Sequence, residues 1–176
     1  MVVSAGPWRW LSTLTVAYGC FRLDIRCRSV ALAINGEIYN HEDLKPTLAD
    51  KTAFRTRSDC EVVVHLYKEI GEDVASKLDG DFAFALAGDK GEFYAARDPI
   101  GVASMYMGWG ADGSVWFASE MKTLVHDCKK ITQFPPGHYW SRQTKLLHRY
   151  YHQTHARTHT HTHTHTHTHT HTHTHR

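Results

Sequence analysis

The pair Asn35-Gly36 is the first place in this chain where residue types and order suggest catalytic chemistry. It follows Ser29 to Ile34, an apolar run that predicts a buried strand ending at the pair. An Asn-Gly pair at such a point can present a side-chain amide and a backbone N–H together, which is what an oxyanion hole requires. On its own the pair is more often an ordinary turn, so its meaning depends on the motifs around it.

A second polar group, Ser58 to Glu61, stands at the start of the best-defined predicted helix. Ser58 can cap this helix, and Glu61 completes a capping box. Apolar residues at helical spacing form one stripe, and Gly71 then ends the helix; the stripe is Val62, Val63, Leu66 and Ile70. Asp59 in the first turn suits the helix dipole, a contribution of roughly 0.3–1 kcal/mol. A carboxylate here therefore has a structural explanation beside any functional one.

The pattern between Ser29 and Tyr151 predicts an α+β domain with stacked antiparallel sheets. From Phe82 to Ala87, large and small residues alternate, which predicts a strand whose alanine face lies against a closely stacked layer. Two glycine-bounded turns, Gly88 to Gly91 and Gly110 to Gly113, predict hairpins. The other expected elements are short helices at 42–48, 73–78 and 119–124, and strands at 92–97, 104–109, 114–117, 137–140 and 145–151.

Several motifs follow Asn35-Gly36-Glu37-Ile38-Tyr39-Asn40 in order along the chain. They are Arg57-Ser58-Asp59-Cys60-Glu61, Leu78-Asp79-Gly80-Asp81-Phe82-Ala83-Phe84-Ala85, Arg97-Asp98-Pro99-Ile100-Gly101, Met105-Tyr106-Met107-Gly108 and Ala118-Ser119-Glu120-Met121-Lys122. Together, from Ala31 to Tyr151, they closely resemble the glutaminase domain of glutamine-hydrolysing asparagine synthetases. The last motif, followed by Phe134-Pro135-Pro136-Gly137, favours this family over glucosamine-phosphate synthase and amidophosphoribosyltransferase, which share the glutaminase fold. The resemblance implies an N-terminal-nucleophile hydrolase fold, a four-layer αββα sandwich with two antiparallel sheets between helices.

The resemblance also implies roles for matching positions. The Asn35 side chain and the Gly36 backbone would form the oxyanion hole as a thiolate attacks the glutamine amide. Asn35, Gly36, Glu37 and Asp59 would bind L-glutamine, with both acids near its α-ammonium group. No metal and no cofactor are expected in this domain. In the family, ATP and Mg act in the separate synthetase domain, and a homo-oligomer stays open.

Other residues of the motifs have structural interpretations. We interpret Arg97 and Asp98 as an ion-paired turn, Tyr39 and Asn40 as residues that fix a loop, and Cys60 as a small apolar filler. His41 and His65 have no partner at a telling spacing, and we assign them no role.

The chain departs from the family pattern at both ends. The family nucleophile is a cysteine exposed by methionine removal, with its own α-amino group as base, whereas the second residue here is Val2. Cys20 stands too close to Asn35 for the family's first strands and helix to lie between them. Nothing after Tyr151 resembles the synthetase domain. We therefore expect an unrelated segment at 1–29, a partial amidotransferase domain without its first strands and helix at 30–152, and a disordered Thr-His tail at 153–176.

The composition excludes several protein classes. Once Arg157 and Arg176 of the tail are set aside, 18 basic residues balance 18 acidic ones, which indicates neither nucleic-acid nor anionic-membrane binding. No run approaches the ~20 apolar residues of a membrane span. Unpaired cysteine spacing and a short, interrupted apolar stretch after Arg9 favour a reducing, cytoplasmic location over secretion. The tail histidines could bind metal in vitro, but we expect no evolved metal site.

Alternative functions stay open at this stage. One is a glutaminase domain that supplies ammonia for ATP-dependent synthesis of asparagine from aspartate. Another is a non-catalytic glutamine-binding or protein-interaction fragment of the same fold, which the missing N-terminal cysteine favours. A third is an unfolded fragment, because loss of the first strands would expose a sheet edge. In each case we expect the chain as written to be catalytically disabled.

Overall fold

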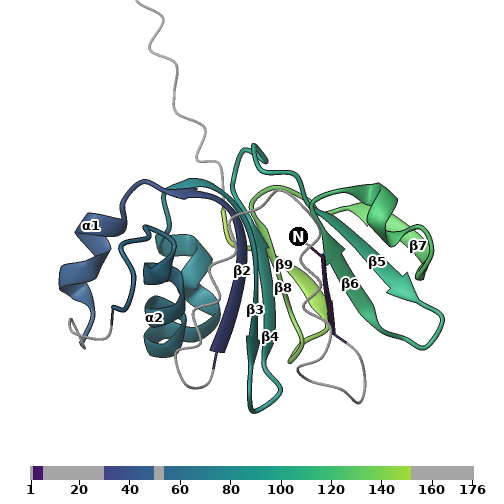
Figure 1. Ribbon diagram of the computed structural model, residues 1–176, viewed down its shortest axis with the longest axis horizontal. Helices are drawn as coiled ribbons and strands as arrows, with labels where there is room; N and C mark the ends of the chain where they lie inside the picture. The colour runs from purple at the N-terminus through teal and green to yellow at the C-terminus, as the bar shows by residue number, and fades with distance from the viewer. Residues whose placement is uncertain (1, 6–29, 50–53, 152–176) are drawn as a thin grey trace, which may run out of the picture.

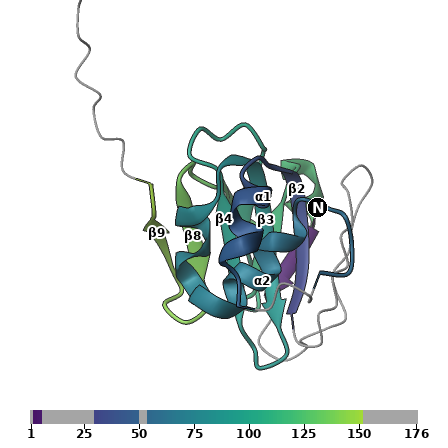
Figure 2. The same ribbon diagram turned by 90° about the vertical axis from the view of Figure 1, so that its left-hand side faces the viewer.

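In the computed structural model of the protein, two antiparallel sheets stacked face to face form the centre of the molecule (Figure 1). The structure describes residues 2–5, 30–49 and 54–151. The four-stranded sheet has the order β1-β6-β5-β7, and the five-stranded sheet has the order β2-β3-β4-β8-β9. Helices α1 and α2 cover the outer face of the five-stranded sheet (Figures 1 and 2). The predicted α+β class with stacked antiparallel sheets is confirmed.

The described elements follow in chain order. The strands are β1 Val2–Ala5, β2 Val30–Ile38, β3 Gly80–Gly88, β4 Phe93–Arg97, β5 Tyr106–Gly110, β6 Val115–Ala118, β7 Cys128–Gln133, β8 His138–Ser141 and β9 Leu146–Arg149. The helices are α1 His41–Leu44 and α2 Glu61–Ile70, with 3-10 turns η1 Lys45–Thr47, η2 Gly71–Lys77 and η3 Met121–Leu124. Both predicted hairpins are present. Strand β7 was not predicted, and β1 pairs with β6 although its residues lie in the segment expected to be unrelated.

The two faces of the five-stranded sheet carry different side chains. The face beneath α2 is lined by large residues such as Phe82, Phe84 and Tyr94, which pack against Val62 and Val63 of the helix. The face toward the second sheet is lined by Ala33, Ala83, Ala85 and Ala95, which share a core with Met107 and Phe117 of the second sheet. Small side chains on one sheet thus accommodate large ones on the other, as the alternation in β3 predicts.

Strand β2 does not end at Asn35-Gly36 as predicted. It pairs with β3 as far as Ile38, which lies opposite Gly80. Gly36 has φ 132°, and a Cβ at this position would lie 1.8 Å from the carbonyl oxygen of Asp81. Only glycine can combine this backbone conformation with continued pairing, so the Asn-Gly pair distorts the strand without ending it.

The start of α2 also differs from the prediction. The helix begins at Glu61, and its N-terminus has no side-chain cap. The Ser58 hydroxyl accepts a hydrogen bond from the backbone N–H of Cys60 at 3.3 Å, while the Glu61 carboxylate is bonded to residues 55 and 56. The capping box is therefore wrong, because Glu61 fixes the preceding loop instead of bonding to Ser58. Gly71 ends the helix with φ 63°, as predicted.

Candidate active site

The predicted oxyanion residues lie in the last part of β2, at the end of the five-stranded sheet where β2 leads into α1 (Figure 1). Ile34 and Ile38 both belong to the core beneath the helices, and Ala33 belongs to the core between the sheets. Because side chains alternate along a strand, Asn35 and Glu37 project on the same side as Ala33. Asn35 is partly buried and Glu37 is exposed, and neither side chain has a hydrogen-bond partner among the described residues.

Asp59 is brought to the same strand by the loop that precedes α2. Its carboxylate accepts a hydrogen bond of 2.7 Å from the backbone N–H of Ile38. Partial burial alone would raise the pKa of Asp59, but this bond and further ones from Cys60 keep the pKa below its ordinary value. Asp59 therefore stays ionised beside the edge of β2, next to the strand residues Asn35, Gly36 and Glu37. Binding of glutamine by these four residues stays a prediction.

Cys60 lies behind this group of residues. Its Sγ atom is 3.6 Å from the carbonyl oxygen of Gly36 and 3.6 Å from a carboxylate oxygen of Asp59. Burial and the adjacent Asp59 carboxylate raise the pKa of the Cys60 thiol to about 12. Burial also raises the pKa of Cys128, the other cysteine that the structure describes. A thiol protonated at neutral pH is a poor nucleophile, so neither group is activated for attack.

Tyr39 and Asn40 connect the end of β2 with the segment that leads into β3. The Asn40 side chain donates to the carbonyl oxygen of Lys77 at 2.9 Å and accepts from the backbone N–H of Asp79 at 3.0 Å. The Tyr39 hydroxyl donates to the Asp81 carboxylate at 2.7 Å, and this bond raises the pKa of Tyr39. The predicted loop-fixing role of both residues is confirmed. Asp81 was not singled out from the sequence, and only the strand register places it opposite Glu37.

Arg97 and Asp98 do not form the predicted ion-paired turn. The Arg97 guanidinium donates at 2.7 Å to three backbone carbonyl oxygens, those of Gly101, Ala103 and Phe134. The buried Asp98 carboxylate accepts from the backbone N–H groups of residues 100, 101, 102 and 103. Within the described residues the two side chains therefore bond to backbone groups and not to each other. Their role is structural, but the predicted ion pair is wrong.

His65 has a partner that the sequence reading missed. Its Nε2 atom lies 3.4 Å from the buried Glu61 carboxylate, and its ring packs against Phe54 at 4.6 Å between centroids. Glu61 also accepts hydrogen bonds from the backbone N–H groups of Arg55 and Thr56 and from the Thr56 hydroxyl. Glu61 and His65 are four residues apart on a helix, and this spacing could have predicted their contact. This network fixes the loop that carries Asp59 to β2.

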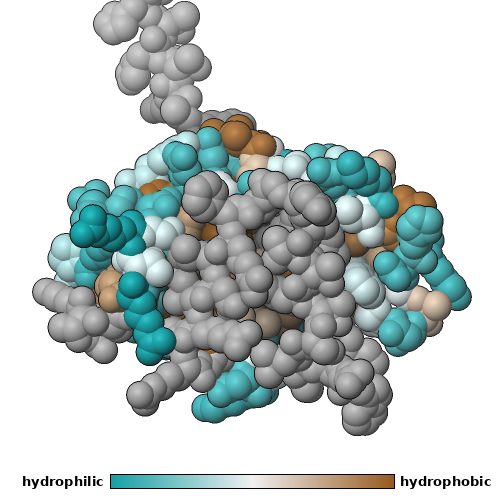
Figure 3. Space-filling model, viewed as in Figure 1, coloured by the Kyte–Doolittle hydropathy of each residue, from teal (hydrophilic) through white to brown (hydrophobic). Residues whose placement is uncertain are grey.

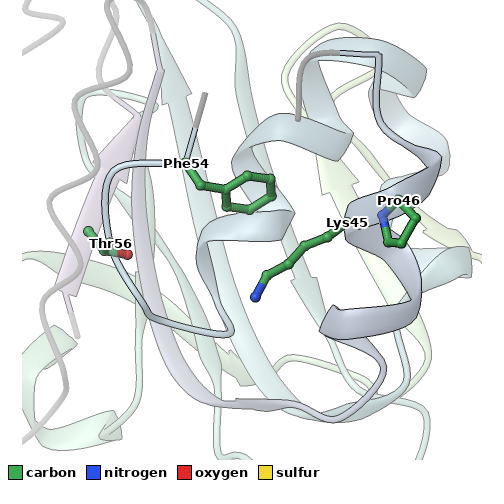
Figure 4. Close-up of a pocket in the computed structure, with 4 residues that line it drawn as sticks. All are labelled: Lys45, Pro46, Phe54 and Thr56. Carbon is green, nitrogen blue, oxygen red and sulfur yellow. The ribbon is translucent and has the colours of Figure 1, made fainter. Parts of the chain in front are cut away.

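A pocket of about 470 Å³ is lined by Phe54 and Thr56 of that loop and by Lys45 and Pro46 (Figure 4). The Lys45 ammonium is bonded to Glu42 at 2.7 Å and lies 5.7 Å from the centre of the Phe54 ring. The pocket contains none of the four predicted site residues, and its cation is already paired. We assign it no function.

The part of the chain that the structure describes lacks two further kinds of feature. It contains no group of three His, Cys, Asp or Glu side chains placed to share a metal ion. None of its helices combines the length and apolar character needed to cross a bilayer. The Thr-His tail, in which we expect no evolved metal site, falls outside the described residues, as do Cys20 and Cys27.

Comparison with known proteins identifies the family. The sequence profile described as "Glutamine amidotransferase domain" matches residues 23–126. A probable glutamine-hydrolysing asparagine synthetase of Dictyostelium discoideum is 54% identical over 126 residues, which cover 70% of this chain and 23% of that protein. Asparagine synthetase 2 of Oryza sativa subsp. japonica is 54% identical over 125 residues, which cover 70% of this chain and 21% of that protein.

A solved structure agrees with these sequence matches. Glutamine phosphoribosylpyrophosphate amidotransferase from B. subtilis superimposes with a TM-score of 0.58 at 27% identity, covering 69% of this chain and 29% of that chain. The fold is thus that of the N-terminal-nucleophile amidotransferases. The chain spans between a fifth and a quarter of the length of the curated relatives named above. With the matched profile, the stacked sheets and the asparagine synthetase relatives in agreement, this chain belongs to the glutamine amidotransferase domain family.

Proposed function

We propose that the described residues form the glutamine-binding and oxyanion-stabilising side of a glutaminase site. The observation that carries this proposal is the position of the Asp59 carboxylate, bonded to Ile38 at 2.7 Å next to Asn35, Gly36 and Glu37. An ionised carboxylate and a side-chain amide that has no hydrogen-bond partner among the described residues lie beside one distorted strand end. These groups are complementary to the α-ammonium and the amide carbonyl of L-glutamine.

Each residue would have a separate role in this site. The Asn35 side-chain amide and the Gly36 N–H would donate to the glutamine amide oxygen as negative charge develops on it. Glu37 and Asp59 would bind the α-ammonium group, since both carboxylates face solvent in part. The Cys60 thiol would help to position the Gly36 carbonyl and the Asp59 carboxylate through its contacts with both. No metal ion takes part in these roles.

We further propose that the chain as written does not release ammonia from glutamine. Cys60 and Cys128 both have pKa values raised by burial, so neither described thiol provides the thiolate that the reaction needs. This favours the second candidate function, a non-catalytic glutamine-binding fragment of the fold.

The proposed context is asparagine synthesis. In a longer protein of this kind, ammonia from glutamine would be used for ATP- and Mg-dependent conversion of aspartate to asparagine. The identity of 54% to asparagine synthetases supports this assignment over that of other amidotransferases. A cytoplasmic location is proposed from the unpaired cysteine spacing.

Two measurements on the purified chain test these proposals. Calorimetric titration with L-glutamine should show binding that weakens at least ~10-fold in Glu37→Gln and Asp59→Asn, because each loses a charge-assisted contact. Asp89→Asn, in the exposed turn between β3 and β4, is the matched control and should bind normally. Equal affinities in all four proteins would rule out the proposed ammonium site.

The second measurement is ammonia release. The natural chain should be inactive, and a version with a family-type N-terminus beginning with cysteine should be active. Activity in the natural chain would overturn the nucleophile proposal and direct attention to Cys20 and Cys27. If the repaired version binds glutamine but stays inactive, the oxyanion assignment of Asn35 and Gly36 is wrong.

A further inference from the structure

A buried carboxylate lies at the start of α2, outside the four residues of the candidate site. Glu61 is fully buried, whereas the surface at the helical end of the molecule is largely hydrophilic in Figure 3. A carboxylate removed from water is destabilising unless hydrogen bonds compensate for its lost hydration. Glu61 can therefore keep its charge only through bonds to other parts of the protein.

Both oxygens of the Glu61 carboxylate make such bonds. One accepts from the backbone N–H of Arg55 at 2.7 Å, and the other accepts from the backbone N–H and the hydroxyl of Thr56 at 2.7 and 2.5 Å. The Nε2 atom of His65 lies 3.4 Å from the first oxygen. Burial alone would raise the pKa of Glu61, but these bonds keep the pKa below its ordinary value. Glu61 is thus ionised and holds residues 55 and 56 against the helix.

Hydrogen bonds continue from Thr56 to Asp59. The Thr56 hydroxyl oxygen also accepts from the backbone N–H of Ser58 at 3.2 Å. The Ser58 hydroxyl donates to Oδ1 of Asp59 at 3.3 Å, while Oδ2 of the same carboxylate accepts from Ile38 at 2.7 Å. One path of hydrogen bonds, here called the Glu61 relay, therefore runs from Glu61 through Thr56 and Ser58 to Asp59 and β2.

Thr56 is the residue at which this path can be cut most cleanly. Its hydroxyl donates to Glu61 and accepts from Ser58, so both hydrogen-bonding functions of the group are used. Valine in its place would keep the size and branching of the side chain but remove both bonds, whereas serine would keep both bonds. Thr56→Val and Thr56→Ser together separate the hydrogen bonds of this residue from its packing.

We propose that Glu61 and Thr56 are positioning residues of the ammonium site, which hold the Asp59 carboxylate against β2 in the orientation that binds the α-ammonium group of glutamine. The proposal rests on the function proposed above, in which Asp59 binds this group. The Glu61 relay restricts the carboxylate before the ligand arrives, and a preorganised group loses less entropy on binding than a mobile one. Neither positioning residue touches glutamine itself.

Hydrogen exchange of the Ile38 amide tests the relay without any ligand. Because this N–H is donated to Asp59, its exchange rate reports whether the carboxylate is in place. NMR on the full chain should show exchange at least ~10-fold faster in Thr56→Val and nearly unchanged in Thr56→Ser. Thr123→Val is the matched control, because the Thr123 hydroxyl donates to the carbonyl oxygen of Glu120 at 2.7 Å beside the four-stranded sheet. Urea unfolding of each variant gives the change in global stability for comparison.

Calorimetric titration with L-glutamine tests the functional part of the proposal. Thr56→Val should weaken binding about 10-fold, because the Asp59 carboxylate loses its fixed orientation. Thr56→Ser and Thr123→Val should bind like the natural chain. Adding Thr56→Val to Asp59→Asn should weaken binding no further than Asp59→Asn alone, since the relay acts through Asp59.

The outcomes are distinguishable. Unchanged exchange at Ile38 in Thr56→Val overturns the proposal, and so does exchange that is faster only in proportion to a loss of global stability. Faster exchange with unchanged glutamine affinity also overturns it when Asp59→Asn weakens binding. If Asp59→Asn binds glutamine like the natural chain, or the natural chain does not bind it, the proposed ammonium site is wrong and the positioning role is overturned with it.

Discussion

Asp98 and Asp59 lie near the same end of the five-stranded sheet, and both use a carboxylate to bind backbone amides, but they differ in how completely they are bonded. Asp98 is fully buried and accepts from the N–H groups of residues 100 to 103. Asp59 is partly exposed, and Ile38 provides its backbone bond from β2. A fully bonded carboxylate stabilises a loop, whereas a partly bonded one retains acceptor capacity for a ligand.

The largest expected effect comes from removing the buried member of this pair. Asp98→Ala should lower the free energy of unfolding by about 3–5 kcal/mol, because the N–H groups of residues 100 to 103 lose their acceptor at a buried position. Urea unfolding followed by circular dichroism measures this effect. Asp89→Ala, in an exposed turn, should change stability by less than ~0.5 kcal/mol. A loss below ~1 kcal/mol for Asp98→Ala would mean that the loop does not depend on this carboxylate.

The next effect concerns rate and leaves stability unchanged. In the version with a restored N-terminal cysteine, Asn35→Ala should reduce kcat about 100-fold, the usual cost of removing one oxyanion donor. Its free energy of unfolding should stay close to that of the parent, because the Asn35 side chain has no bond among the described residues. Ammonia release and urea unfolding, measured on the same preparation, separate the two quantities. A stability loss as large as that of Asp98→Ala would reclassify Asn35 as structural.

Gly36→Ala extends the comparison to the backbone that positions Asp59. The added Cβ would meet the Asp81 carbonyl oxygen at 1.8 Å, and φ 132° is unfavourable for alanine, so β2 must move away from β3. We expect a loss of about 1–3 kcal/mol together with weaker glutamine binding. Gly113→Ala is the control, because it also has positive φ but has no atom within 4 Å of the new Cβ. Equal effects of the two changes would show that steric contact at Gly36 is unimportant.

The smallest effect is the pH dependence contributed by Asp59. Its folded-state pKa lies below the ordinary value of 3.8, so the stabilisation is fully present above that value and is lost as pH falls through the folded pKa. At pH 7, Asp59→Asn should cost about 1 kcal/mol, after allowance for solvent screening. The difference between the two proteins should shrink below about pH 4. Urea unfolding between pH 2 and 7 would show a constant difference if the Asp59 charge contributes nothing.

The sequence predicted most of the sheet-forming segments, whereas the roles of the four site residues stay predictions. The alternation in β3 and the glycine-bounded turns are local signals, and they gave the hairpins correctly. Strand β7 was missed because its residues, Cys128 to Gln133, include no buried position and no alternation of burial, and the strand depends on pairing with β5. The continuation of β2 through Gly36 was missed for the same reason, since it is set by pairing with β3.

The details of the polar network were less predictable. The Asp59 bond to Ile38 joins residues 21 positions apart, and the Arg97 bond to Phe134 joins residues 37 apart. No local pattern encodes such bonds, because they depend on where loops meet in the folded chain. The wrong ion pair between Arg97 and Asp98 and the wrong capping box at Ser58 have a common cause. In both cases the charged side chains bond to backbone groups that the tertiary structure brings close to them.

In the loop after β4, the residues that fix the backbone conformation are different from those whose side chains are exposed. Arg97 and Asp98 act on backbone atoms, which every sequence provides, while Ile100 and Val102 point outward and take little part in folding. Substitutions at these two positions can therefore accumulate during evolution without altering the loop. Exchange of these two side chains would change the surface of the loop and leave its backbone conformation unchanged.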